Sequence, residues 1–176
     1  TIFPQVIGLG STWNTRLVQD IAEAAAKEAR AAGTTLANSP DLDLARDPRW
    51  GRVEETFGED PYLVTQMGLS IVRGMQGDMN RDRSEMIISA IKHYVAHSSP
   101  EGGVNIGPVA AGERQLRELY LKPFAAAIQE GGALAVMPAY SELDGIPVHA
   151  SEFLLTEILR NELGFMGMTI ADYGAI

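Results

Sequence analysis

The stretch that decides the fold of this chain is LDLARDPRWGR at residues 42–52, where a short apolar run leads into a loop of charged side chains. The same pattern returns further along the chain, each time after a stretch with helical periodicity. The later apolar runs close at Ile91, Met137 and Ile170, and they are followed by Lys92-His93, Tyr140 and Asp172. Polar chemistry at the carboxyl ends of successive parallel strands is typical of α/β barrel enzymes, so this pattern predicts that architecture.

The spacing of apolar residues predicts alternating helices and strands. Helices are expected at about 15–32, 61–74 and 113–130, and from Ser151 to just before Gly164, with a kink at Pro123 in the third. Strands are expected at about 42–44, 86–91, 133–137 and 168–171. Strands separated by helices pair in parallel, with the helices packed outside the sheet.

The predicted fold class is therefore α/β, in the form of a partial (β/α)8 TIM barrel. About four parallel strands with outer helices are expected across residues 1–176, whereas a closed barrel has eight strands and about 250 residues. We expect a single incomplete domain that lacks the first strands and the end of the barrel. Because the edges of a parallel sheet need cover, the chain is expected to require the rest of its polypeptide.

Composition limits the classes of function. With 45% apolar residues and 21% charged residues the chain is globular, and no apolar stretch of about 18 residues could span a membrane. The net charge of −9 argues against a nucleic-acid partner, because binding a phosphate backbone relies on Lys and Arg. A neutral carbohydrate suits this surface better. No cysteine is present, so disulfide and thiolate chemistry are excluded. The chain begins with Thr1 rather than Met, so we expect its true start to lie upstream and leave the localisation open.

The loop from Asp47 to Pro61 carries two arginines with alternative roles. Arg49 and Arg52 could donate in-plane hydrogen bonds to the hydroxyls of a sugar. The loop could equally be structural, with its Arg and Glu side chains paired with one another. We expect both: one arginine faces the sugar and the other braces the loop.

Lys92 and His93 follow an apolar run as two adjacent donors that point in different directions. One can face the mouth of a barrel while the other braces a loop. His93 and His97 are four residues apart with Glu101 nearby, which would suit a metal on a helix. Because these residues follow a strand and surround Pro100, no metal site is predicted.

Asp172 follows the last apolar run, which would leave its carboxylate at the rim of the barrel. The alternative is an ordinary cap for a following helix. Tyr140 and Glu142 follow the preceding run and could orient a carboxylate or a ring oxygen, whereas Asp144-Gly145 is expected to form a turn.

Several of these motifs together resemble the amino-terminal catalytic barrel of glycoside hydrolase family 3, the family of β-glucosidases and β-xylosidases. They span nearly the whole chain in the order of the family. The matching stretches are FPQ at 3–5 with GLGSTW at 8–13, RDPRWGR at 46–52 with EDP at 59–61, KHY at 92–94, VMPAY at 136–140 and ADYGAI at 171–176.

The resemblance implies a retaining, exo-acting β-glycosidase without a cofactor, acting on terminal β-D-glucosyl or β-D-xylosyl residues of an oligosaccharide or glycoside. Asp172 would be the nucleophile that forms the glycosyl-enzyme intermediate. Arg52, Lys92 and His93 would bind sugar hydroxyls, and Tyr140 would lie beside the nucleophile. Arg49 and Tyr173 would support the site. The acid/base would come from a carboxyl-terminal α/β sandwich domain that this chain lacks.

Two positions bear on the branch of the family. Ala171 stands where the family most often has Ser before the nucleophile, and Tyr173 stands where it has Trp or Tyr. After Lys92-His93 the chain continues as YVAH rather than the Phe-Pro-Gly-His run of the N-acetylglucosaminidases, which disfavours that branch.

Three interpretations remain open. The chain is a piece of a retaining β-glycosidase, inactive by itself. Alternatively it is a barrel of the same ancestry that binds sugar without cleaving it, or an unrelated (β/α) enzyme or structural module.

Overall fold

A four-stranded parallel sheet forms the centre of the computed structural model, which describes residues 1–77 and 83–176. Its strands are β1 (Leu36–Ala37), β2 (Ile88–Tyr94), β3 (Ala135–Pro138) and β6 (Met168–Thr169). They lie in the order β1-β2-β3-β6, and every neighbouring pair is parallel. The predicted α/β class, with parallel strands and outer helices, is confirmed.

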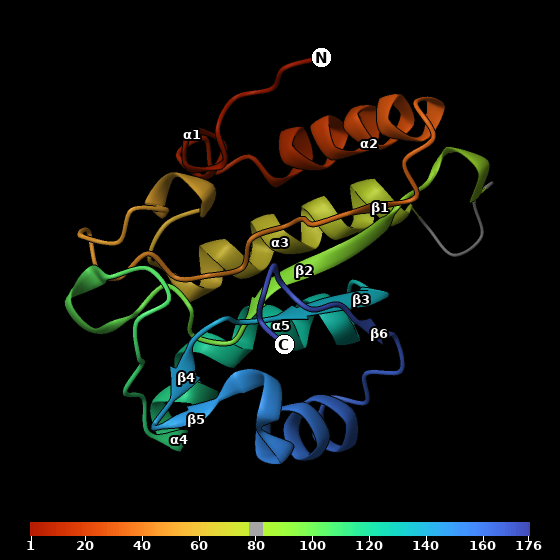
Figure 1. Ribbon diagram of the computed structural model, residues 1–176. Coiled ribbons are helices and arrows are strands. Elements are labelled where there is room, and N and C mark those ends of the chain that lie inside the picture. Colours follow the sequence, from red (N-terminus) through yellow and green to blue (C-terminus); the bar gives the residue numbers. More distant parts are fainter. Residues whose placement is uncertain (78–82) are drawn as a thin grey trace.

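Helices connect the strands and cover the sheet. The α-helices are α1 (Val6–Gly10), α2 (Thr15–Ala31), α3 (Pro61–Gln76), α4 (Glu113–Gln115) and α5 (Leu121–Gln129), and π-helical segments form η4 (Leu116–Tyr120) and η6 (Phe153–Glu162). Short 3-10 turns are η1 (Val53–Glu55), η2 (Arg83–Glu85), η3 (Glu101–Gly103) and η5 (Val148–Ala150). Helix α3 packs against β2 and lies between α2 and α5 (Figure 1).

Local signals set where the two long helices begin. Asn14 accepts a hydrogen bond from the Leu17 amide at 3.0 Å and caps α2. Asp60 accepts one from the Leu63 amide at 2.7 Å, and Pro61 occupies the first position of α3. Proline is tolerated there because a first-turn amide has no partner within the helix.

Helix α3 extends past the end predicted at Gly74 and stops at Gly77, whose φ of 67° favours glycine. Gly74 lies where α2 crosses α3. A side-chain carbon added there would stand 2.5 Å from the Gln19 carbonyl oxygen and 2.6 Å from the Ala22 methyl carbon. The glycine thus permits close packing of the two helices.

The kink expected at Pro123 takes the form of the π-helical turn η4 just before it. Pro123 then falls in the first turn of α5, where its missing amide hydrogen breaks no bond within that helix. The wide turn lets the helical path continue to Gln129.

The strand predicted at 42–44 is wrong, because β1 lies earlier, at Leu36–Ala37. The chain still runs beside β2 through an isolated bridge between Asp41 and Lys92, with the Leu42 amide donating to the Lys92 carbonyl at 2.6 Å. The next amide, of Asp43, points away from β2 in the extended segment and donates to Asp41 Oδ1, two residues earlier, at 2.9 Å.

The ends of β2 and β6 also differ from the prediction. Strand β2 continues to Tyr94, so Lys92 and His93 lie inside the strand rather than after it. The register against β3 shifts between Lys92 and Tyr94, which leaves His93 at an irregularity of the β-bulge kind. Such a shift redirects a side chain. Strand β6 ends at Thr169, so Asp172 follows it by three residues.

A small hairpin, β4 (Glu142–Leu143) and β5 (Ile146–Pro147), follows β3 and was not predicted. The expected turn at Asp144-Gly145 is confirmed, with φ of 50° and 84° at its two residues.

One apolar core lies between the sheet and the helices, and Ile91, Val136 and Ala127 are among its fully buried members. Within the described part of the chain, no helix is long and apolar enough to cross a bilayer.

Candidate active site

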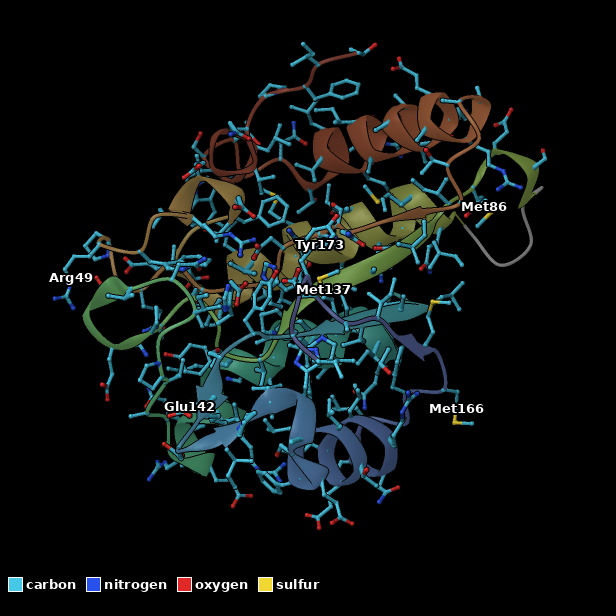
Figure 2. The ribbon with its side chains drawn as sticks, viewed as in Figure 1. Arg49, Met86, Met137, Glu142, Met166 and Tyr173 are labelled. Carbon is cyan, nitrogen blue, oxygen red and sulfur yellow. The ribbon has the colours of Figure 1, made fainter. Side chains whose placement is uncertain are left out.

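The loops that leave the carboxyl ends of the strands gather at one end of the sheet, on the left of Figure 1. They comprise the segment before α3, the segment between β2 and α4, and the β4–β5 hairpin. Figure 2 places Met86 and Met166 at the opposite end and Tyr173 near the middle of the view. These loops carry the predicted polar residues, which can therefore lie close together at this end of the sheet.

His93 is the centre of the resulting cluster and is 1% exposed. Its Nδ1 atom lies 2.8 Å from Asp43 Oδ2, and its backbone amide donates to the same oxygen at 3.3 Å. On the other side of the ring, Nε2 lies 3.1 Å from Arg52 Nη2 and 3.5 Å from Asp172 Oδ2. His93 thus lies between a buried carboxyl group and the carboxylate that follows β6.

Asp172 is 9% exposed, and one of its oxygens is held by a backbone hydrogen bond. Oδ1 accepts a hydrogen bond from the Tyr173 amide at 2.8 Å, and Oδ2 faces His93. Tyr140, two residues after β3, lies near this carboxylate: burial and then interaction with Asp172 raise the pKa of its hydroxyl. The structure therefore brings Asp172, Tyr140 and His93 together.

Arg52 is fixed by a two-bond ion pair with Glu55. Its Nε and Nη2 atoms each lie 2.7 Å from a Glu55 oxygen, and Nη1 lies 3.1 Å from His97 Nε2. Lys92 Nζ lies 3.5 Å from Glu55 Oε2. Hydrogen bonding from Arg52 lowers the pKa of Glu55 to about 2, so Glu55 is an anion at neutral pH and positions both cations.

Arg49 lies outside this cluster. Its side chain is 67% exposed and pairs with Asp47, with Nη2 and Oδ2 2.7 Å apart. Figure 2 shows Arg49 at the outer edge of the loop, away from Tyr173. Arg49 therefore holds its own loop. Glu142 also lies apart, with an exposed side chain on β4.

Both buried histidines are neutral at neutral pH. Burial lowers the pKa of His93 to about 4 and that of His97 to about 3. Arg52 can only donate, so each histidine accepts through Nε2 and carries its hydrogen on Nδ1. That assignment agrees with the 2.8 Å contact from His93 Nδ1 to Asp43.

The metal arrangement of His93, His97 and Glu101 does not form. The Arg52 guanidinium contacts the Nε2 atoms of both histidines, and Glu101 is exposed in the turn η3. A different donor set does come together: oxygens of Asp41 and Asp43 and a nitrogen of His93 lie within 4.8 Å of one another. These residue types bind metals in other proteins.

Three members of the cluster were not singled out from the sequence: Asp41, Asp43 and Glu55. A signal for the first two exists in the alternation of Asp and Leu over residues 41–44. In an extended segment this period of two points both carboxyl groups to one side and both leucines to the other. For Glu55 the sequence offered only the expectation that Arg and Glu side chains of its loop pair with one another, and His97 was considered only as a metal ligand.

Comparison with known proteins adds evidence of ancestry. The family model described as the glycosyl hydrolase family 3 N terminal domain matches residues 1–176. A β-xylosidase of Formosa agariphila is 44% identical over 98% of this chain, and the match covers 24% of that protein. A periplasmic β-glucosidase of Salmonella typhimurium is 39% identical over 100% of the chain and 23% of its own length.

Solved structures agree with this result. The β-glucosidase of Listeria innocua in complex with glucose superposes with a TM-score of 0.96 and 40% identity, over 99% of this chain and 24% of the other. The chain therefore spans about a quarter of the length of the proteins that it resembles.

Proposed function

This chain belongs to glycoside hydrolase family 3, and from that premise we propose that it carries the nucleophile half of a retaining, exo-acting β-glycosidase active site. The substrates would be oligosaccharides or glycosides with a terminal β-D-glucosyl or β-D-xylosyl residue. The names of the relatives, β-xylosidase and β-glucosidase, and the glucose complex of the Listeria innocua enzyme support this substrate class.

One observation carries the proposal: Asp172 Oδ2 stands 3.5 Å from His93 Nε2, among side chains suited to bind hydroxyls. The Tyr173 amide holds Oδ1, which leaves Oδ2 as the attacking atom. In the first step an electron pair of Oδ2 would form a bond to the anomeric carbon. The bond to the leaving oxygen would break, and that oxygen would take a proton from an acid.

The sugar would be bound by both hydrogen-bond donors and hydrogen-bond acceptors. Arg52 and Lys92 offer N–H donors whose charge is balanced by Glu55. His93 accepts from Arg52 through Nε2, because its hydrogen lies on Nδ1, and so fixes the guanidinium, while the Asp172 carboxylate is the acceptor of the set. Hydroxyl groups both donate and accept, so such a mixed set suits a neutral carbohydrate. Tyr140 would orient the nucleophile through its hydroxyl.

The acid/base would come from outside residues 1–176. Retention requires a second carboxyl group about 5 Å from the nucleophile, able to carry a proton and later to activate water. Glu55 is unsuited, because Arg52 lowers its pKa to about 2. We place the missing group in a carboxyl-terminal α/β sandwich domain. Further strands of the same polypeptide would complete the barrel beside β1 and β6, the edges of the sheet.

Mechanism-based labelling of the full-length protein tests this function. A slow 2-fluoro glycoside should accumulate as an ester on Asp172, and peptide mass spectrometry would locate it. Asp172→Asn should take no label under the same conditions. Label on another residue would remove Asp172 from the mechanism. Sugar binding without any label or turnover would favour the non-catalytic carbohydrate-binding barrel.

A further inference from the structure

Behind His93 lies a pair of buried carboxyl groups whose hydrogen bonding is incomplete. Asp41 and Asp43 are 4% and 2% exposed. Asp41 Oδ1 accepts from the Asp43 amide at 2.9 Å, and Asp43 Oδ2 contacts His93 Nδ1 at 2.8 Å. Within the described part of the chain, the two other oxygens, Asp41 Oδ2 and Asp43 Oδ1, have no partner. Two buried carboxylate oxygens without a donor are costly, and a proton kept by one of the two groups would remove that cost.

The charges around the pair do not balance if both groups are ionised. Neutral His93 faces the pair, with Asp41 Oδ2 3.5 Å from its Nδ1. The nearby cations are Arg52 and Lys92, and both already pair with Glu55. Asp172 adds a further carboxylate on the far side of His93. Oxygens of the two buried carboxyl groups lie within 4.8 Å of one another, and like charges at that separation in a buried site favour retention of one proton.

We propose that Asp41 is a positioning residue that keeps a proton and donates it in a hydrogen bond to Asp43 Oδ1. Asp43 is then a single carboxylate that accepts from Asp41 on one oxygen and from His93 Nδ1 on the other. Both unpaired oxygens gain a partner by this one proton. Burial, followed by the charge of Asp43, raises the pKa of Asp41 well above its ordinary value, in agreement with this arrangement.

The consequence for the site is a fixed orientation of His93. Its hydrogen stays on Nδ1, so the Nε2 lone pair always faces Arg52 and accepts from Nη2. If Asp41 lost its proton, a second negative charge 3.5 Å from Nδ1 would favour a protonated ring, and Nε2 would become a donor that competes with Arg52. This inference rests on the proposed function only where it assigns His93 to the sugar site.

The test compares two substitutions at the same position in the full-length protein. Asp41→Asn keeps a neutral group with an N–H donor for Asp43, whereas Asp41→Leu has similar bulk and no donor. We expect kcat/KM of Asp41→Asn to stay within about threefold of wild type. Asp41→Leu should lose about tenfold to a hundredfold, the size expected for one hydrogen bond to a charged group.

A spectroscopic measurement separates this inference from the proposed function, because it needs no turnover. Infrared difference spectra of wild type against Asp41→Asn should contain the C=O stretch of one protonated carboxyl group. Absence of that band overturns the inference even if the enzyme is active. A wild-type protein that shows the band but hydrolyses no glycoside would leave the inference standing and reject the function.

The alternative to a shared proton is a metal ion bound by Asp41, Asp43 and His93. In that case Asp41→Asn should be as damaging as Asp41→Leu. A chelator such as EDTA should also lower wild-type activity, and added Zn²⁺, Mg²⁺ or Ca²⁺ should restore it. Either result would overturn the shared proton.

Discussion

Arg52 and Glu55 form a two-bond ion pair in which both nitrogen–oxygen distances are 2.7 Å. The pair spans a single turn, η1, and turns the remaining guanidinium edge toward His93 and His97. A planar guanidinium held on one edge has its other N–H groups fixed in direction. Arg52 is therefore preorganised before any sugar arrives.

Removing the anion of this pair should impair binding of the substrate. We expect Glu55→Gln to lower kcat/KM about tenfold or more, because one charge-assisted bond is lost and Arg52 can rotate. Steady-state kinetics with an aryl β-glycoside would measure it. Glu54→Gln is the matched control, since Glu54 is the exposed neighbour in the same turn. Equal values for both variants would contradict the role of Glu55.

The same pair should contribute to stability in a defined pH range. The pKa of Glu55 is lowered from 4.5 to about 2 in the folded protein, so its contribution is complete above about pH 4.5. It should decline as the pH falls toward 2, where the folded carboxylate is protonated. Urea unfolding of wild type and Glu55→Gln at a series of pH values would test this. A stability difference that grows on acidification would contradict the sign.

The two loop arginines should differ sharply in their importance. Arg52→Ala removes contacts to Glu55 and both histidines, so we expect kcat/KM to fall about a hundredfold or more. Arg49→Ala breaks only the exposed pair with Asp47 and should change kcat/KM less than about threefold. Parallel kinetic measurements would decide. A large loss in Arg49→Ala would show that its loop reaches the substrate.

Asp172→Asn should abolish turnover and leave the fold intact. The amide cannot form the covalent ester, so we expect kcat to fall by about four orders of magnitude or more. Circular dichroism and sugar binding by calorimetry would show that the protein is folded. Added azide should restore activity to Asp172→Gly and yield a glycosyl azide of inverted configuration. Retained activity in the Asn variant would exclude Asp172 as the nucleophile.

Close packing of α2 on α3 should make Gly74 intolerant of even a methyl group. A carbon added at Gly74 would stand 2.5 Å from the Gln19 carbonyl oxygen, so Gly74→Ala should destabilise by about 1–3 kcal/mol. Gly8→Ala is the control, because nothing lies within 4 Å of the added carbon in helix α1. Urea unfolding of both variants would measure the difference. Equal stability would show that the helices can separate at no cost.

Much of the architecture could be predicted because it depends on neighbouring residues. Asn14 and Asp60 cap helices through amides three residues away, and Asp144-Gly145 adopts the backbone that its turn requires. The parallel pairing also followed, since a helix between two strands leaves no other simple connection. These interactions act over a few residues and are visible in order along the chain.

The ends of the strands were harder to predict. The apolar run at 42–44 looked like a strand, yet the Asp43 amide bonds to the Asp41 side chain instead of a neighbouring strand. The irregularity at His93 depends on the register against β3, which lies more than forty residues further along. Whether a given amide bonds to a nearby side chain or to a neighbouring strand depends on which acceptor lies beside it after folding.

The sequence by itself determined the family, the α/β alternation and the set of residue types at the strand ends, because periodicity and motifs are local. Only the tertiary structure decided that His93 stands between Asp43, Arg52 and Asp172, and that Asp41 and Glu55 complete the cluster. Hydrogen bonds and charge interactions depend on separation in space and on burial. Neither quantity exists until segments distant in the chain meet in the fold.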